Sequence, residues 1–258
     1  MSLKISNKII GFDREFKLLK SLFAYNKLPQ NIMFQGIDGI GKYTMCLNLI
    51  CNFLKINPSD PEEKLNKDTN VLILNSELNN FEFKLDDTNK IINFCQLKSL
   101  DEKPKFIIMK NSNYLNTNAV NSLLKIIEEP KENVYFLFTC NSLNQNIDTL
   151  NSRFFIKKLF LNNKFYKEII DNFSTYNNLE NISDNYDLQD SPGIFLRKYF
   201  YNLNPNLEKL KKNNQTLFYN IISDKLLKTS SNNIKILKKL KLNLSLNNDI
   251  KKIINKFI

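Results

Sequence analysis

The sequence predicts an α/β fold built around a parallel β-sheet and followed by helices. Up to about residue 160, short apolar runs alternate with helical patterns, as is typical of parallel strands joined by right-handed helical crossovers. Three of the five glycines, Gly36, Gly39 and Gly41, lie between one such strand and a helix. Beyond residue 160 no convincing strand pattern remains, and the segments are helical and rich in Lys and Asn.

The first elements lead into and out of the glycine cluster. Residues 14–24 carry apolar side chains at helical spacing, which predicts an amphipathic helix. Residues 32–34 form a short apolar strand, and residues 45–54 again have helical spacing. The polar residues 55–70, with two prolines, are predicted to form a surface excursion before a strand at 71–74.

The remaining elements continue the alternation of helices and strands. Asp86 or Asp87 is predicted to cap the next helix, and Asn116 or Thr117 the one after it, which ends before Pro130. The apolar segments are predicted as three further strands, at residues 105–109, 134–138 and 154–160.

The composition excludes several classes of protein. With 42% hydrophobic residues in 258, the chain can bury a core, and it has no apolar run of about 18 residues and no signal-peptide pattern, so we expect a cytosolic protein without membrane contact. The four cysteines form no CxxC pair and histidine is absent. Zinc sites, disulfide scaffolds and His-dependent catalytic triads are therefore not expected.

The formal charge of +11 would ordinarily suggest a polyanionic partner. Lys, Asn, Ile and Phe are abundant while Gly and Trp are scarce, a bias typical of AT-rich coding, so much of the basic excess is attributable to background. Against this lysine background the three arginines, Arg14, Arg153 and Arg197, stand out.

Residues 36–44, GIDGIGKYT, have the context of a phosphate-binding loop because they follow a strand and open a helix. Glycines allow backbone N–H groups to turn toward a phosphate, and Lys42 would reach the terminal phosphates. The hydroxyl expected directly after the lysine to hold Mg²⁺ is absent, because Tyr43 stands there and Thr44 is one place late. The sequence leaves open whether this loop binds nucleotide or is a vestige of a nucleotide-binding loop.

The carboxylate that hydrolysis would need is missing at the end of the strand at 105–109. Lys110 stands where an Asp would hold the metal, and a cation there would repel Mg²⁺. Asn141, which ends the next strand, could contact a γ-phosphate or cap a turn. Arg153 carries a guanidinium that binds phosphate bidentately, although a surface ion pair is the alternative.

These motifs occur in an order that resembles the AAA+ domain of bacterial clamp-loader subunits. The most specific part is NAVNSLLKIIEEPKENVYFLFTCN followed by TLNSRF, and the lid motif of the family is matched by SPG at residues 191–193. The resemblance covers about residues 8–200. It implies an AAA+ P-loop sheet domain at 1–155, a small helical lid at 156–203 and a reduced helical collar at 204–258.

The resemblance also implies residue roles. Residues 36–44, including Gly36, Gly39, Gly41, Lys42 and Thr44, would be the Walker A loop, Asn141 the sensor-1 residue, and Arg153 an arginine finger that reaches ATP held by an adjacent motor subunit. Three departures from the family pattern matter: Lys110 replaces the Walker B acid, Gly193 stands where motor subunits carry an arginine, and Phe154 replaces a cysteine. Asn31 replaces a histidine often found at this position, and the zinc module of many relatives is missing.

These features predict a clamp-loader subunit of a DNA polymerase that hydrolyses no ATP of its own and has no polymerase site. No cofactor is required, although ATP or ADP could be held statically, and no metal site is expected. The expected partners are the motor and clamp-opening subunits, with the sliding clamp and primed DNA reached through the complex.

Two alternatives stay open. An active ATPase motor would need a substitute metal ligand, for which Asp38, Glu128 and Glu129 are the candidates. A lysine-rich DNA-binding module could be formed by residues 204–258, although a solvated lysine face on collar helices explains the same pattern.

Overall fold

The computed structural model describes residues 8–203, apart from residues 58, 76–82, 98, 100–101, 142–147, 178–181, 184–185 and 187–189. Its contacts divide the chain into two units, Met1–Leu196 and Arg197–Ile258. The helical collar segment predicted for residues 204–258 lies outside the described residues. Every strand of the described part belongs to the first unit.

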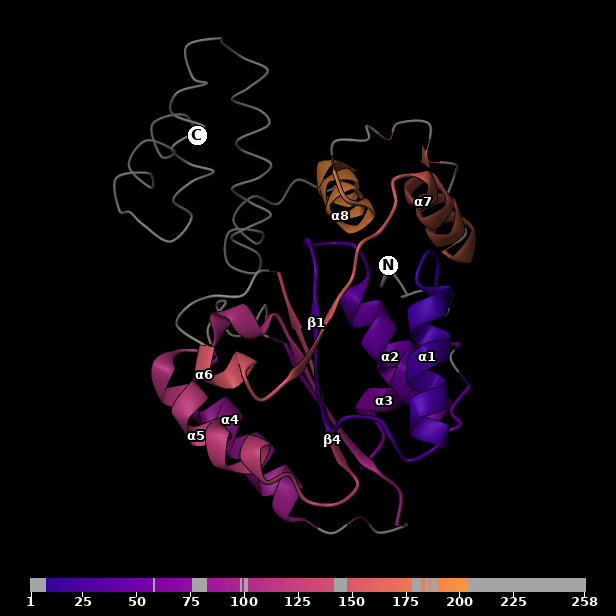
Figure 1. Cartoon of the computed structure of the whole chain (residues 1–258). Coiled ribbons are helices and arrows are strands. Elements are labelled where there is room, and N and C mark those ends of the chain that lie inside the picture. The colour runs from indigo at the N-terminus through magenta and orange to yellow at the C-terminus, as the bar shows by residue number, and fades with distance from the viewer. Residues whose placement is uncertain are drawn as a thin grey trace, which may run out of the picture. The chain divides into compact units, whose positions relative to one another are not determined.

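A five-stranded parallel sheet forms the centre of the first unit (Figure 1). The strand order is β2-β3-β4-β1-β5, and each neighbouring pair is parallel. The strands occur at the five predicted places, which confirms the parallel α/β prediction. They are β1 (Asn31–Gln35), β2 (Val71–Asn75), β3 (Lys105–Lys110), β4 (Val134–Cys140) and β5 (Phe155–Lys158).

Helices cover both faces of this sheet (Figure 1). One face is covered by α1 (Asp13–Ala24), α2 (Lys42–Phe53) and α3 (Pro61–Asn66), and the other by α4 (Leu85–Gln96), α5 (Thr117–Glu128) and α6 (Asp148–Asn151). Two helices follow the sheet along the chain, α7 (Lys164–Tyr176) and α8 (Pro192–Leu203).

Burial on both faces explains the unbroken apolar runs of the central strands. In β3, Phe106 and Ile108 pack with the α1–α2 side, whereas Ile107 and Met109 pack with the α4–α5 side, and all four are fully buried. Each such side chain contributes about 1.5–3 kcal/mol relative to exposure. A strand buried on both faces shows no polar alternation, as predicted for a parallel sheet.

Helix ends follow local signals, with two corrections to the predictions. Asn116 caps α5 as predicted, because its side-chain oxygen accepts the Ala119 N–H at 2.9 Å. The cap of α4 differs: the helix begins at Leu85, and Asp87 accepts the Lys84 N–H from within the first turn at 3.2 Å. The predicted surface excursion contains the short helix α3, which begins with a proline at its first position.

The sheet continues past the boundary expected after residue 155, because β5 ends at Lys158. The predicted lid, residues 156–203, extends across the division between the two units at Leu196. The three-domain arrangement therefore stays a prediction.

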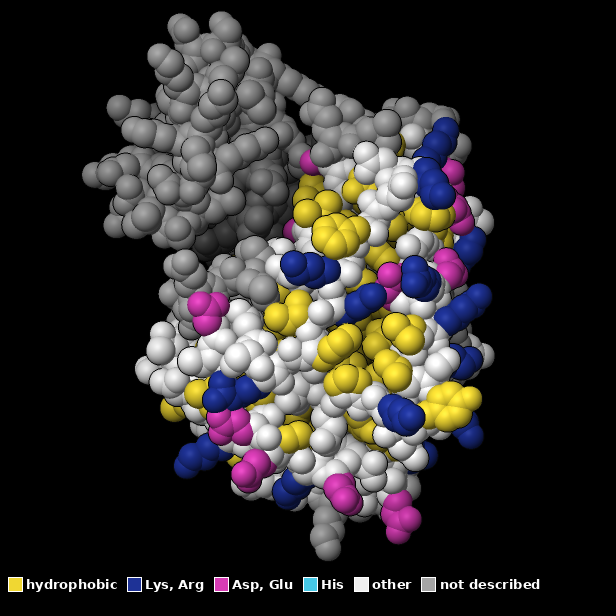
Figure 2. Space-filling view, in the orientation of Figure 1, with side chains coloured by type: hydrophobic (Ala, Val, Ile, Leu, Met, Phe, Trp, Pro, Cys, Tyr) yellow, Lys and Arg dark blue, Asp and Glu magenta, His cyan; other side chains and the backbone are white. Residues whose placement is uncertain are grey.

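The described surface carries basic and acidic side chains together. Figure 2 shows Lys and Arg side chains spread along the drawn face, with apolar and acidic side chains between them. None of the described helices is long and apolar enough to cross a lipid bilayer.

Candidate functional site

The glycine-rich loop connects β1 to α2 at the carboxyl end of the sheet. Gly39 and Gly41 have φ angles of +79° and +99°, in the left-handed region that glycine adopts without strain. A side chain at Gly39 would also collide with its surroundings, since a Cβ there would lie 2.4 Å from Ser191 Oγ. At Gly41 a Cβ would meet nothing within 4 Å. The glycines are therefore required by the geometry of the loop, as the sequence indicates.

Lys42 turns back into its own loop. Its side chain is only 5% exposed, and Nζ donates to the carbonyl oxygens of Gly36 at 2.8 Å and Ile37 at 2.7 Å. Nζ also donates to Asn141 Oδ1 at 3.0 Å. An ammonium has three N–H donors, so these three acceptors can use all of them. The structure brings Gly36, Lys42 and Asn141 together, but the lysine faces protein oxygens.

Residues 191–193, at the start of α8, are hydrogen-bonded directly to the loop. Ser191 Oγ donates to the Asp38 carbonyl at 2.6 Å, and the Gly193 N–H donates to the Gly39 carbonyl at 2.9 Å. A Cβ at Gly193 would lie 2.7 Å from the Gly39 oxygen, so the two backbones touch. Gly193 was expected to be part of the SPG lid motif and to stand in place of a missing arginine, but its contact with the loop was not predicted.

A cavity of about 200 Å³ lies beside the loop. Gly39, Gly41 and Thr44 line it together with mainly apolar side chains, among them Ile10, Phe12 and Phe173. Ligand pockets in proteins usually measure about 300–1,000 Å³, so this cavity is small for a nucleotide. Thr44, whose hydroxyl comes one position after the expected metal-binding hydroxyl, is among the lining residues.

Lys110 stands where a Walker B acid was expected, and it takes part in a different set of contacts. The Lys110 ammonium lies 5.2 Å from the centre of the Tyr43 ring, and the Tyr43 hydroxyl donates to Glu62 Oε1 of α3 at 2.8 Å. Beside them, the Asn111 N–H donates to Thr139 Oγ1 at 3.0 Å. The side chain that stands in place of the metal-binding hydroxyl therefore connects α2 to α3.

Metal ligands are not clustered in the described residues. No group of three or more His, Cys, Asp or Glu residues is close enough there to hold an ion. Burial raises the pKa of Cys51, Cys95 and Cys140 to about 11, and the pKa of Cys46 rises for the same reason. These buried thiols are therefore not activated as nucleophiles.

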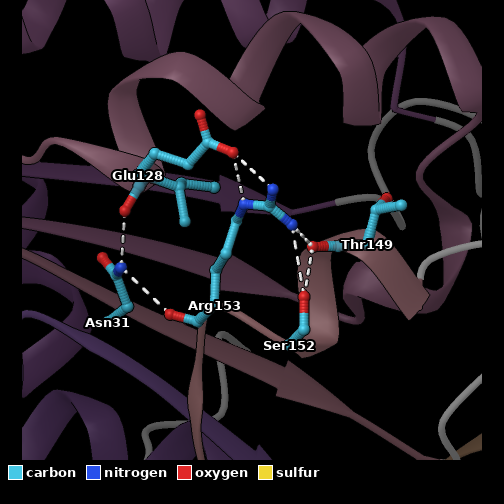
Figure 3. Close-up of polar contacts among 6 residues, drawn as sticks. Asn31, Glu128, Thr149, Ser152 and Arg153 are labelled. Atoms are coloured by element: carbon cyan, nitrogen blue, oxygen red, sulfur yellow. Dashed lines mark hydrogen bonds and ion pairs between the residues drawn. The ribbon is translucent and has the colours of Figure 1, made fainter.

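Arg153 lies at the other end of the sheet, two residues before β5 begins (Figure 3). β5 pairs with β1 from Ile32 onward, so Arg153 is beside the start of β1, whereas the loop follows the end of β1. The four residue steps along β1 span about 13 Å at the usual rise of a strand. The structure therefore does not bring Arg153 to the loop of its own chain.

The Arg153 guanidinium is held by three neighbours (Figure 3). Nε donates to Glu128 Oε1 at 2.8 Å, and Nη2 donates to the same oxygen. Nη1 donates to the Thr149 carbonyl and, at 3.2 Å, to Ser152 Oγ. Glu128, at the end of α5, was considered from sequence as a substitute metal ligand. That hypothesis is wrong for Glu128, because it pairs with Arg153 at the end of the sheet opposite the loop.

Comparisons with known proteins identify the family of the chain. A family model described as "DNA polymerase III, delta subunit" matches residues 12–162, which is more than half of the chain. The chain belongs to this family. The predicted resemblance to bacterial clamp-loader AAA+ proteins is thereby confirmed, together with the α/β P-loop fold.

This DNA polymerase III delta family member aligns with less than half the length of each of two relatives. The chain is 38% identical over 96 residues to the DNA polymerase III subunit delta' of Buchnera aphidicola subsp. Baizongia pistaciae, an alignment that covers 37% of this chain and 26% of that protein. It is 25% identical over 158 residues to the replication factor C small subunit of Methanosarcina acetivorans, covering 57% and 40%.

A solved structure supports the fold alone. The crystal structure of a DNA replication initiation factor superposes with a TM-score of 0.53 at 17% identity, covering 80% of this chain and 65% of the other.

Proposed function

We propose that this chain is a delta-prime-like subunit of a DNA polymerase III clamp loader that hydrolyses no ATP itself and supplies Arg153 in trans to ATP held by a neighbouring motor subunit. The observation that carries the proposal is the separation of Arg153 from the chain's own loop by the length of β1. An arginine at the opposite end of the sheet can act on a phosphate only if another subunit presents it.

The contacts of the loop support the first part of this proposal, that the chain hydrolyses no ATP itself. Lys42 already donates to three protein oxygens, and Lys110 stands where a carboxylate would hold the metal. Phosphoryl transfer depends on a metal and a cation placed on the transferred phosphate. Nucleotide would be held statically, if at all, and no cofactor is needed for the role in trans.

The partners in this proposal are the motor and clamp-opening subunits of a hetero-oligomer, through which the sliding clamp and primed DNA are reached. The names of the relatives, a DNA polymerase III subunit and a replication factor C subunit, support this assignment. The chain would be part of a DNA polymerase complex without a polymerase site of its own.

The test is ATP hydrolysis by the reconstituted loader with clamp and primed DNA. We expect Arg153→Ala to lower turnover by about 10³–10⁵, the range associated with an arginine finger, and Lys42→Ala to leave it within about two-fold of wild type. Loss of turnover with Lys42→Ala, together with hydrolysis by the isolated chain, would instead identify an active motor.

The two alternatives have less support. For a motor, Asp38 and Glu129 would remain as substitute ligands, but Glu129 follows α5 at the end of the sheet opposite the loop. The DNA-binding module predicted for residues 204–258 lies outside the described residues and stays a prediction.

A further inference from the structure

Arg153 is fixed on its own subunit by contacts that the proposed role does not explain by itself. The guanidinium has five N–H groups, and four of them donate to Glu128, Thr149 and Ser152. The fifth, on Nη2, has no acceptor among the described residues. With the side chain 31% exposed, this N–H can reach an oxygen that comes from outside the chain.

The backbone under Arg153 is fixed as well (Figure 3). Asn31 Nδ2 donates to the Ile127 carbonyl at 2.8 Å and to the Arg153 carbonyl at 3.2 Å. One amide at the start of β1 thus ties the last turn of α5 to the segment that leads into β5. Because Glu128 follows Ile127 directly, Asn31 also sets the distance between the Glu128 and Arg153 backbones.

From this junction of Asn31, Glu128 and Arg153 we infer that Glu128 is a positioning residue: it orients the Arg153 guanidinium toward a phosphate of the neighbouring subunit. The inference rests on the proposed function in trans. Glu128 contacts the guanidinium and not the substrate, so it acts through Arg153.

Glu128 has two opposing effects on turnover, and their magnitudes decide whether its removal slows or speeds the reaction. The carboxylate offsets part of the arginine charge, but the pair is exposed to solvent, where such an attraction corresponds to a factor of about five or less. An unrestrained arginine side chain carries rotamer freedom that corresponds to about 30-fold when fully fixed. Fixing the guanidinium therefore outweighs the loss of charge, and catalysis benefits from groups oriented in advance.

The chain offers a matched control for this inference. Glu129 is the next residue, is also exposed, and makes no side-chain hydrogen bond or ion pair within the described part of the chain. Glu129→Ala removes the same charge at the same place without touching the guanidinium. Glu128→Gln keeps an oxygen that can accept from Nε and Nη2.

The experiment measures kcat and KM for ATP in the reconstituted loader with clamp and primed DNA. We expect Glu128→Ala to lower kcat about three- to ten-fold with KM unchanged, Glu128→Gln to stay within about two-fold of wild type, and Glu129→Ala to match wild type. Combining Glu128→Ala with Arg153→Ala should be no slower than Arg153→Ala alone. Equal melting temperatures and equal complex assembly for the Glu128→Ala and Glu129→Ala chains would exclude a merely structural effect.

The outcomes separate this inference from the proposed function. If Arg153→Ala leaves turnover intact, the proposed role of Arg153 in trans is wrong, and the inference about Glu128 is then wrong as well. If Arg153→Ala abolishes turnover while Glu128→Ala equals or exceeds wild type, the role in trans stands and Glu128 is not a positioning residue. A Glu128→Gln variant as slow as Glu128→Ala would likewise overturn the inference, because charge and not orientation would then matter.

Discussion

The cationic side chains at the two ends of the sheet differ in burial and in their hydrogen-bond partners. At the carboxyl end, Lys42 is buried and its ammonium donates to three oxygens of its own chain. At the amino end, Arg153 is partly exposed and keeps one N–H for an acceptor from outside. A cation that is satisfied internally supports the fold, whereas an oriented and accessible cation is suited to a partner. In the proposed function, the loop therefore supports the fold and the arginine serves the partner.

The largest expected effect concerns the contact between the loop and residues 191–193. Gly39→Ala should lower the free energy of unfolding by about 2–5 kcal/mol, because it adds left-handed strain and a Cβ placed 2.4 Å from Ser191 Oγ. Gly41→Ala has the same kind of strain but open space around it, so a loss of about 1–2 kcal/mol is expected. Urea titration of both variants measures the difference. Equal losses would show that the close packing of the loop against residues 191–193 contributes nothing to stability.

The next effect tests the assignment of the two cations directly. Lys42→Ala should cost about 1.5–3 kcal/mol of stability, because it leaves buried carbonyls without the charged donor. Arg153→Ala should cost no more than about 1 kcal/mol, since its ion pair with Glu128 is at the surface. Thermal unfolding should show a drop of about 2–4 °C per kcal/mol for a chain of this size.

Stability and turnover should thus respond in opposite order: Lys42→Ala is the more damaging change for stability, and Arg153→Ala for ATP hydrolysis by the loader. If Lys42→Ala left the melting temperature unchanged, the internal bonds of the lysine would contribute nothing, and the loop would be free to bind phosphate.

Much of the fold could be predicted because its signals are local. The apolar runs of β3 and β4, the cap at Asn116 and the glycines of the loop each depend on neighbours in the sequence. The helix α3 was missed because its six residues lie in a polar stretch with too few apolar positions to show a period.

The site was only partly predictable, because its decisive contacts join distant residues. The bond from Gly193 to Gly39 and the pair of Arg153 with Glu128 leave no trace in local spacing. The direction of the Lys42 side chain was also open, since a lysine in this loop can face either a phosphate or the carbonyls of the loop. Its burial and three acceptors distinguish these cases only once the fold is known.

The smallest expected effect is that of nucleotide on the isolated chain. Because the Lys42 donors are already used and the cavity beside the loop is small, 1 mM Mg-ATP should raise the free energy of unfolding by less than about 0.4 kcal/mol, the value for a ligand present at its Kd. Thermal unfolding with and without Mg-ATP measures this, and the Lys42→Ala chain serves as the control for effects outside the loop. A rise of several degrees that disappears in Lys42→Ala would contradict the expectation. It would mean that the lysine exchanges its three protein oxygens for phosphate, and that the two ends of the sheet are less different than their contacts indicate.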